Sequence, residues 1–154
     1  MGRNLIMAID RSEDGGRVIA IVGAYEHVLK SRVFGQYCTG LKHFRRVSSR
    51  RKARYIRFFE KRFTKLKEVL ELIRIVQTID KVNEIIQIHQ PALIIIDNKL
   101  AASIDYQCMI LEDSPKPRYM NDLITIADNL ANYFRLILKN NPRKYGEKLK
   151  LFEK

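Results

Sequence analysis

A short run of apolar residues near the middle of the chain places the tightest constraint on the fold. Pro91 precedes Ala92–Ile96, a segment of five consecutive apolar residues, and the segment ends abruptly at Asp97. A continuous apolar run of this length is typical of a strand that is buried on both faces of a sheet. Such strands are usually parallel to a neighbour and covered by helices on both sides. The run therefore predicts an α/β fold.

Three segments near the N-terminus are predicted to be strands of the same sheet. Leu5–Ile9 is apolar and ends at Asp10, and Arg17–Tyr25 is rich in Val, Ile and Ala. Val28–Cys38 alternates loosely between apolar and polar residues, which also favours a strand. A polar stretch with two glycines predicts a turn between the first two strands. We expect the three strands to form an antiparallel meander.

The next segment predicts an amphipathic helix with two different faces. Apolar residues recur every three or four positions from Ile56 to Ile73, and Ser48 or Ser49 is a candidate N-cap. The opposite face carries a continuous basic stripe, formed by Arg50, Arg54, Arg57, Lys61 and Lys65. Helix geometry thus separates a core-facing side from a side that suits a nucleic-acid backbone. Tyr55 and Phe58 lie among these cations and are candidates for stacking on bases.

The remaining elements complete the sheet and its helices. Thr78 or Asp80 is a candidate cap for a helix that ends near Gln90, and Cys108–Leu111 is a candidate fifth strand. Tyr119–Leu138 is predicted to be a second strongly amphipathic helix. We expect a single domain over residues 1–154, in which residues 139–154 form a basic C-terminal tail.

The charge of the chain indicates the class of its partner. The sequence contains 29 Lys or Arg and 17 Asp or Glu, which gives a formal net charge of +12. Residues 42–74 alone contain thirteen Lys or Arg against three Glu. A field of this kind attracts polyanions, so the expected partner is nucleic acid, either DNA or RNA. The plainer explanation is a solvated basic helix that binds nothing.

The sequence also bears on where the protein works. Its apolar runs are too short to cross a bilayer, and we recognise no signal peptide. Cys38 and Cys108 show no metal-ligand spacing, and we expect both to be reduced, buried thiols. These features predict a cytoplasmic protein without a membrane partner.

Two predicted strands end at an aspartate. Asp10 follows the N-terminal strand, and Asp97 follows the central apolar run. If these two strands are parallel neighbours, both carboxylates leave the sheet at the same edge, where open α/β sheets usually place their ligands. The plainer explanation is that each aspartate forms a turn or caps a helix.

A third acid is predicted from the phase of the last amphipathic helix. Asp128 lies at the border of its apolar face, whereas Asp122 points farther toward solvent and is the second choice. Three converging carboxylates supply the hard oxygen ligands that Mg²⁺ and Mn²⁺ prefer. Such ions activate water and stabilise the leaving oxygen in phosphodiester hydrolysis. His27, His43 and His89 lack a convergent spacing, so we assign them no catalytic role.

With these elements in order, the chain resembles the ribonuclease H-like superfamily, which includes Holliday-junction resolvases and transposase cores. Within it the chain is most similar to an uncharacterised prokaryotic family that opens with a strand and Asp-Glu-Ser-Gly and closes with a helix carrying an Ala-Asp pair. The likeness spans roughly Leu5 to Arg135. It is carried by the element order and three motifs, Ile9-Asp10-Arg11-Ser12, Ile94-Ile95-Ile96-Asp97 and Ile126-Ala127-Asp128-Asn129-Leu130-Ala131.

This resemblance implies a mixed sheet, with an antiparallel three-stranded meander plus parallel strands, flanked by helices. It also implies that Asp10, Asp97 and Asp128 are the metal ligands and catalytic residues. The chain departs from the family at Arg11, where an acidic residue is expected although Glu13 and Asp14 follow, and at Thr125, where a Gln is frequent.

Three hypotheses follow. The leading one is a divalent-metal-dependent nuclease, or nuclease-like protein, that uses Mg²⁺ or Mn²⁺ and holds the backbone of its substrate on the basic stripe. The second is a non-catalytic nucleic-acid-binding module on a degenerate ribonuclease H-like fold, favoured by Arg11. The third is an interaction protein, monomeric or homodimeric, whose basic helix docks on an acidic partner.

Overall fold

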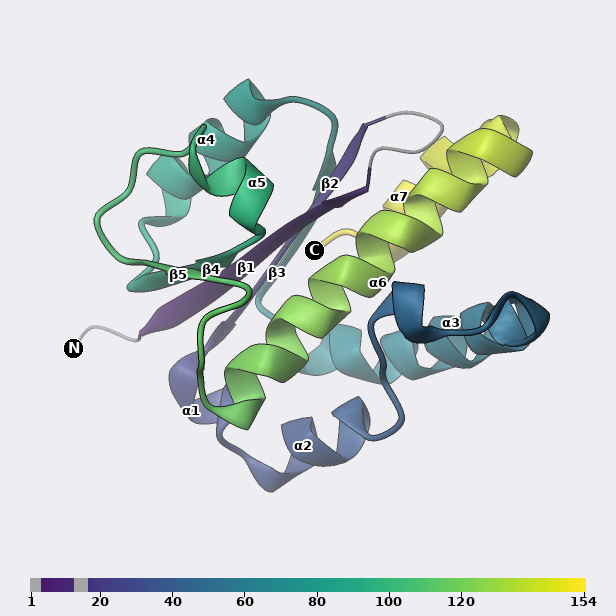
Figure 1. The fold of residues 1–154 in the computed structure, drawn as a ribbon, viewed down its shortest axis with the longest axis horizontal. Coiled ribbons are helices and arrows are strands. Elements are labelled where there is room, and N and C mark those ends of the chain that lie inside the picture. The colour runs from purple at the N-terminus through teal and green to yellow at the C-terminus, as the bar shows by residue number, and fades with distance from the viewer. Residues whose placement is uncertain (1–3, 13–16) are drawn as a thin grey trace.

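Five strands form one mixed sheet in the order β3-β2-β1-β4-β5 (Figure 1). The computed structural model describes residues 4–12 and 17–154. Its strands are β1 (Leu5–Ser12), β2 (Val18–Tyr25), β3 (Leu72–Val76), β4 (Leu93–Ile96) and β5 (Met109–Leu111). β2 is antiparallel to both β1 and β3, whereas β4 is parallel to both β1 and β5. The expected α/β fold with a mixed sheet is confirmed, and so is the parallel pairing of β1 with β4.

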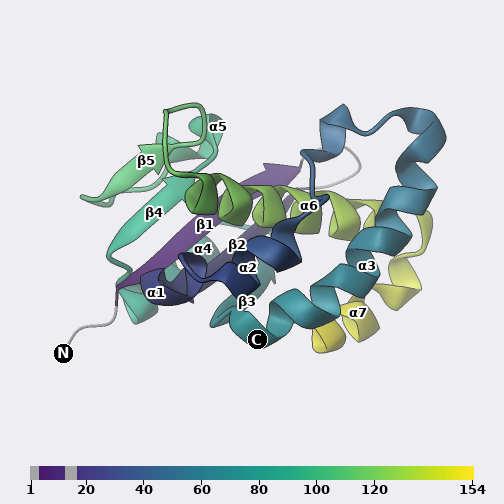
Figure 2. The same cartoon turned by 90° about the horizontal axis from the view of Figure 1, so that it is seen from below.

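Helices cover both faces of this sheet (Figures 1 and 2). One face carries α1 (Glu26–Leu29), α2 (Arg32–Cys38), α3 (Lys52–Val69), α6 (Arg118–Asn140) and α7 (Tyr145–Phe152). The other face carries α4 (Ile79–His89) and α5 (Asn98–Ala101). Short 3-10 helices are η1 (Phe44–Arg46), η2 (Ser49–Arg51) and η3 (Pro142–Lys144).

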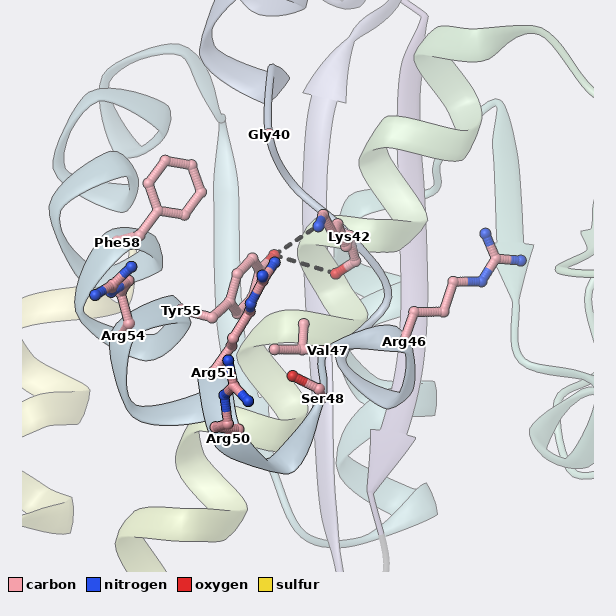
Figure 3. A pocket seen from close by; sticks show the side chains of 10 residues that line it. All are labelled: Gly40, Lys42, Arg46, Val47, Ser48, Arg50, Arg51, Arg54, Tyr55 and Phe58. Carbon is pink, nitrogen blue, oxygen red and sulfur yellow. Dashed lines mark hydrogen bonds between the residues drawn. The ribbon is translucent and has the colours of Figure 1, made fainter.

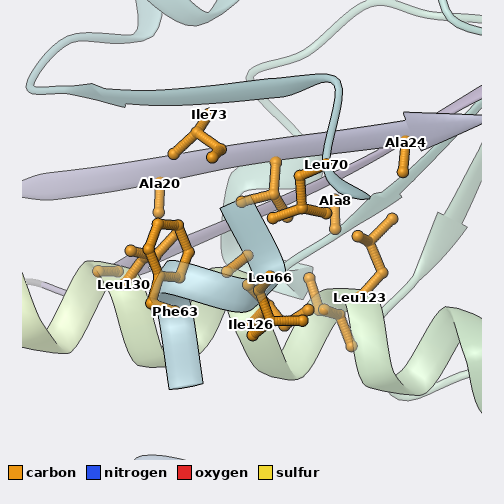
Figure 4. Close-up of a cluster of buried hydrophobic side chains, with 14 of the residues drawn as sticks. Ala8, Ala20, Ala24, Phe63, Leu66, Leu70, Ile73, Leu123, Ile126 and Leu130 are labelled. Atoms are coloured by element: carbon orange, nitrogen blue, oxygen red, sulfur yellow. The ribbon is translucent and has the colours of Figure 1, made fainter. Parts of the chain in front are cut away.

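Alternation along the strands divides the core into two apolar clusters. On β1, Ile6 and Ala8 face the larger helical layer, whereas Met7 and Ile9 face α4 and α5. The long helix α6 packs against β1 and β2, and its buried Leu123, Ile126 and Leu130 meet side chains of the sheet and of α3 (Figure 4). Both faces of the central strands are therefore buried, as the run at Ala92–Ile96 predicted.

The assignment of Val28–Cys38 to a strand is wrong, because this segment forms α1 and α2. Ser31 caps α2, and its Oγ accepts a hydrogen bond from the Phe34 backbone N–H. Phe34 and Cys38 are buried four residues apart, which is the spacing of one helix face. The third antiparallel strand is instead β3, and α1, α2 and α3 lie between it and β2 in the sequence.

The predicted helix after residue 48 is correct in type but differs at both ends. α3 ends at Val69, and Ile73 lies in β3, where it pairs with Val22. Ser48 and Ser49 do not cap α3, since its N-cap position is Arg51, which makes no side-chain capping bond. The predicted helices near Thr78 and over Tyr119–Leu138 are confirmed as α4, which Thr78 caps, and α6.

The two cysteines differ in burial. Cys38 is buried and free as expected, but Cys108 is exposed, so its expected burial is wrong. Among the described residues, no helix is both long and apolar enough to span a membrane. The glycine turn before Arg17, with Glu13 and Asp14, lies outside the described residues.

Candidate metal centre

Three carboxylates lie side by side near the carboxyl ends of three neighbouring parallel strands. Ile9 of β1 pairs with Ile96 of β4, which in turn pairs with Leu111 of β5. The residue after each of these is acidic, namely Asp10, Asp97 and Glu112. One carboxylate oxygen from each of the three lies within 4.8 Å of the others. The register of the parallel strands alone is enough to bring these acids together.

All three acids point toward the helical layer that contains α6. Side chains alternate along a strand, so Asp10 has the same orientation as Ile6 and Ala8 in the cluster beneath α6. Ile95 and Ile110 also face that cluster, which places Asp97 and Glu112 on the same side. The acids therefore form a row between the end of the sheet and α6.

Asp10 is the most buried of the three. Only 4% of its surface is exposed, and its Oδ1 accepts a hydrogen bond from the Arg11 backbone N–H. Burial raises the pKa of Asp10 to about 9, and the negative charges of Glu112, Asp128 and Asp97 add to this rise. Burial also raises the pKa of Glu112, with Asp97 and Asp128 adding to the rise and His43 opposing it. The site thus concentrates negative charge that a cation would stabilise.

Asp128 lies on α6 beside this row. Asp128 Oδ2 and Glu112 Oε1 both lie 3.8 Å from His43 Nδ1, which places these two carboxylates close together. Through its charge, Asp128 also adds to the raised pKa of Asp10 and Glu112. Its Oδ2 accepts a hydrogen bond from the Phe44 backbone N–H at 2.8 Å, and its Oδ1 accepts one from Asn132 at 3.3 Å. Asp128 is not part of the group that falls within 4.8 Å, which among the described residues is Asp10, Asp97 and Glu112. Asp122, the second choice, lines a separate pocket with Arg118 and Tyr119.

His43 joins the acid row to the loop before α3. Its Nδ1 lies 3.8 Å from both Glu112 Oε1 and Asp128 Oδ2. The interaction with Asp128 raises the pKa of the His43 imidazole above its ordinary value, and Glu112 adds to this rise, whereas burial opposes it. The backbone of the next residue, Phe44, also binds Asp128. The loop is therefore attached directly to the acidic site.

Arg11 contacts the acid in the middle of the row, Asp97. Its Nε lies 3.3 Å from Asp97 Oδ2, and both side chains are mostly buried. The contact is an ion pair without a hydrogen bond, since no described residue donates a hydrogen bond to Asp97 Oδ2. The basic residue that follows Asp10 in the sequence thus partly neutralises the acid of the neighbouring strand.

The residues of the predicted basic stripe are all exposed along α3 and the turn before it. Arg50 and Arg54 also line a pocket of about 860 Å³, together with Lys42, Arg46 and Arg51 (Figure 3). Apolar surface of the same pocket comes from Gly40, Val47, Tyr55 and Phe58. Arg57, Lys61 and Lys65 do not line it. The stripe is therefore divided between a concave part and an open part of the surface.

Sequence reasoning missed two residues of this region. Glu112 follows the predicted strand Cys108–Leu111 in the same way that Asp10 and Asp97 follow theirs, so the signal that identified those two also applies to it. His43 had no such signal, because the loop that carries it reaches Glu112 and Asp128 only in three dimensions.

Comparisons with known proteins bear on the fold. No protein-family model matches the sequence, and no curated protein matches it either. One solved structure to which the chain is similar is the crystal structure of the ribonuclease H2 from Pyrococcus horikoshii OT3. The two share 17% sequence identity with a TM-score of 0.51, and the match covers 96% of this chain and 76% of the ribonuclease. The topology and this likeness together show that the chain has a ribonuclease H-like α/β fold.

Proposed function

We propose that the protein is a divalent-metal-dependent nuclease, or nuclease-like protein, that acts on phosphodiester bonds of DNA or RNA. The observation that carries the proposal is the row of three carboxylates at the ends of three adjacent parallel strands. A fold shared with a protein named as a ribonuclease supports nucleic acid as the substrate class. The three sequence motifs that contain Asp10, Asp97 and Asp128 support membership in the prokaryotic family whose last helix carries an Ala-Asp pair.

The chemistry of these residues fits Mg²⁺ or Mn²⁺. Carboxylate oxygens are the hard ligands that both ions prefer. All three residues of the described cluster are carboxylates. Burial raises the pKa of Asp10 and the neighbouring acids add to the rise, so a cation among these carboxylates would offset both effects. Asp97 Oδ2 is buried and accepts no hydrogen bond from the described residues, although the Arg11 guanidinium lies 3.3 Å away.

Each acid then has a role that its position supports. Asp10, Asp97 and Glu112 would hold the ion, and Asp128 is the fourth acid, which the Phe44 N–H and Asn132 orient. Bound ions of this kind activate water and stabilise the charge on the leaving oxygen. In the hydrolysis a water oxygen bonds to phosphorus, one P–O bond breaks, and the leaving oxygen gains a proton. Of the basic stripe, the exposed Arg50 and Arg54, which line the pocket, would position the phosphates.

A cleavage assay tests this proposal. Purified protein is mixed with labelled DNA and RNA, single-stranded and duplex, with Mg²⁺, Mn²⁺ or EDTA. We expect cleavage that needs the ion and that Asp10→Asn, Asp97→Asn and Glu112→Gln each reduce by about 100-fold or more. Glu84→Gln, which changes an exposed acid on α4, is the matched control and should cleave normally. Cleavage that continues unchanged in Asp10→Asn would refute the assignment.

A second candidate function is favoured by the contact between Arg11 and Asp97. A fixed cation at this acid competes with a metal ion, as expected of a domain that binds nucleic acid without cutting it. This candidate predicts binding that weakens steeply with salt and no turnover with either ion. Binding that does not respond to salt would contradict it, and ion-dependent cleavage would favour the nuclease.

A further inference from the structure

We infer that the pocket at the start of α3 binds an unpaired nucleotide, so that the substrate or ligand is nucleic acid with a single-stranded segment. The inference deepens the proposed function and rests on it insofar as nucleic acid is the partner. The pocket is formed by the loop after α2, by η2 and by the first turns of α3, and Figure 3 shows the side chains that line it.

The lining of this pocket matches the two parts of a nucleotide. Tyr55, Phe58 and Val47 offer apolar surface of the kind that a base packs against. Five cations surround that surface, namely Lys42, Arg46, Arg50, Arg51 and Arg54. Among the described residues that line the pocket, none is acidic. Its volume of about 860 Å³ lies in the range of small-molecule sites, which is ample for one nucleotide.

An unpaired segment suits this geometry better than an intact duplex. The bases of a duplex are stacked on one another inside the helix, so the duplex presents phosphates and groove edges to a concave surface. It would leave the apolar wall of Tyr55 and Phe58 without a partner. A base that has left its stack can lie flat against an aromatic ring, and such contacts are tolerant of sequence. The ring centroids of Tyr55 and Phe58 are 5.8 Å apart and tilted, so the base would lie against the wall and not between the rings.

The walls of the pocket are fixed by hydrogen bonds to the core helix α6. Tyr55 Oη donates to Asn129 Oδ1 and accepts from the Lys42 backbone N–H, and Asn129 Nδ2 donates to the Lys42 carbonyl. Asn129 itself is buried. These bonds hold the Tyr55 ring and the loop in one arrangement before a ligand arrives, which lowers the entropic cost of binding.

The opposite wall is fixed by Arg62. Its Nη1 donates to the carbonyls of Tyr37 and Thr39, and its guanidinium lies over the Phe58 ring at 4.9 Å from the centroid. Gly40 adopts a φ of +89° and its Cα approaches Phe58 so closely that a Cβ there would lie 3.1 Å from the ring. Phe58 is thereby held at the edge of the pocket.

The same loop connects the pocket to the candidate metal centre. Lys42 and Arg46 line the pocket, and His43, between them in the sequence, contacts Glu112 and Asp128. Lys42, His43 and Arg46 also line a second hollow of about 440 Å³ that extends along α6 to Asn121 and Thr125. A strand anchored by one base in the pocket would therefore have a basic path past the loop toward the acids.

Binding measurements in EDTA test this inference separately from catalysis. The anisotropy of a labelled 12-nucleotide oligothymidine is followed with wild-type protein, with Arg54→Glu in the pocket, and with Lys65→Glu on the open part of α3. Both substitutions reverse one exposed charge on the same helix. We expect Arg54→Glu to weaken binding about tenfold and Lys65→Glu by no more than about twofold. Equal losses of affinity in the two variants would overturn the nucleotide-binding role of the pocket. They would indicate that only the charge of the basic stripe contributes to binding.

Two further comparisons sharpen the test. A 12-base-pair duplex should bind more weakly than the single strand at the same salt concentration, and tighter duplex binding would overturn the inference. Polyglutamate should not displace the oligonucleotide at matched charge concentration, since a site for charge alone would not distinguish the two polyanions.

If Asp10→Asn abolishes ion binding or cleavage while oligonucleotide affinity is unchanged, the two sites are distinct. If the wild type never cleaves but still binds in this pattern, the nuclease fails and the pocket stands.

A fluorescent variant reports the base contact directly. The chain contains no Trp, so Phe58→Trp introduces a single indole at the pocket edge. We expect the oligonucleotide to quench its emission through stacking, whereas the duplex and polyglutamate leave it unchanged. Absence of quenching at a saturating oligonucleotide concentration would overturn the base-binding role. The Arg54→Glu and Lys65→Glu pair decides the matter if Phe58→Trp does not fold.

Discussion

Arg11 Nε lies 3.3 Å from Asp97 Oδ2, so the residue that follows Asp10 on β1 contacts the acid that follows β4. Both side chains are mostly buried, where charges interact more strongly than at the surface. The contact supplies part of the positive charge that the row of carboxylates attracts. If the candidate centre holds a divalent ion as proposed, Arg11 should weaken its affinity for that ion.

Removing this charge should strengthen ion binding. In Arg11→Gln, Asp97 loses a competing cation, and we expect Mn²⁺ to bind roughly tenfold more tightly, equivalent to about 1.4 kcal/mol. Isothermal titration calorimetry of the metal-free protein measures this directly. Arg17→Gln, which removes a charge from an exposed residue before β2, is the matched control and should leave the affinity unchanged. An unchanged or weaker affinity in Arg11→Gln would show that Asp97 does not hold the ion.

The buried carboxyl of Asp10 should make the metal-free protein less stable as the pH rises. Its folded-state pKa is raised to about 9 from an ordinary value of 3.8, so between these values the unfolded chain has lost a proton that the folded protein keeps. The free energy of unfolding then falls with rising pH, by up to about 1.4 kcal/mol per pH unit, across this window. Asp10→Asn cannot titrate and should lack this part of the decline.

Thermal melts in EDTA at pH 5 and pH 8 test this expectation. We expect Asp10→Asn to exceed the wild-type melting temperature by more at pH 8 than at pH 5, with a gain on the order of 4 °C or more at the higher pH. Adding Mn²⁺ at pH 8 should raise the melting temperature of the wild type and not that of the variant. A variant that is less stable than the wild type at both pH values would contradict the electrostatic account.

The sequence contained the signal for most of the acid row. Asp10 and Asp97 were identified because each ends an apolar run, and the predicted adjacency of their strands is confirmed by the pairing of Ile9 with Ile96. Glu112 carries the same signal, but β5 is only three residues long and partly exposed, so its apolar run is weak. The phase of α6 placed Asp128 at the border of the core, where its side chain is mostly buried beside the row.

Other features depended on contacts that are distant in sequence. Val28–Cys38 was assigned to a strand because its apolar residues alternate loosely. The Ser31 cap is a local helix signal that this assignment overlooked, and the burial of Phe34 against the distant core also favours the helix. The proximity of His43 to Glu112 depends on a loop that Tyr55 and Asn129 hold in place. No local pattern encodes such a loop, because its conformation is set by hydrogen bonds to residues more than ten positions away.

Two glycine substitutions should have opposite effects on stability. Gly40→Ala places a Cβ at a φ of +89° and 3.1 Å from the Phe58 ring, so we expect a loss of about 1–2 kcal/mol. Gly35→Ala lies within α2, where no heavy atom of the described neighbours is within 4 Å of the added Cβ, and should gain about 0.5–1 kcal/mol. Urea denaturation measures both.

The same pair also reports on the pocket. Gly40→Ala should weaken oligonucleotide binding, because Phe58 must move, whereas Gly35→Ala should not affect it. A Gly40→Ala protein as stable as the wild type would show that the loop adopts a different conformation in solution.

The C-terminal residues should contribute to stability far more than a basic tail would. Phe152 of α7 is buried, and its ring lies 4.9 Å from that of Phe63 and 5.0 Å from that of Tyr133. Beyond it, the backbone of Lys154 exchanges two hydrogen bonds with Ile73, which extends the sheet beside β3. The end of the chain is thus packed on both the helical layer and the edge strand.

Phe152→Ala should therefore cost about 3–5 kcal/mol, the usual range for removing a buried aromatic ring. For a chain of this size that is a fall in melting temperature of about 6–20 °C. Leu151→Ala, at a neighbouring position where 58% of the residue is exposed, is the control and should change stability by less than about 0.5 kcal/mol. Similar small effects from both substitutions would mean that residues 139–154 do not pack on the core, and the expected single domain over residues 1–154 would then end before α7.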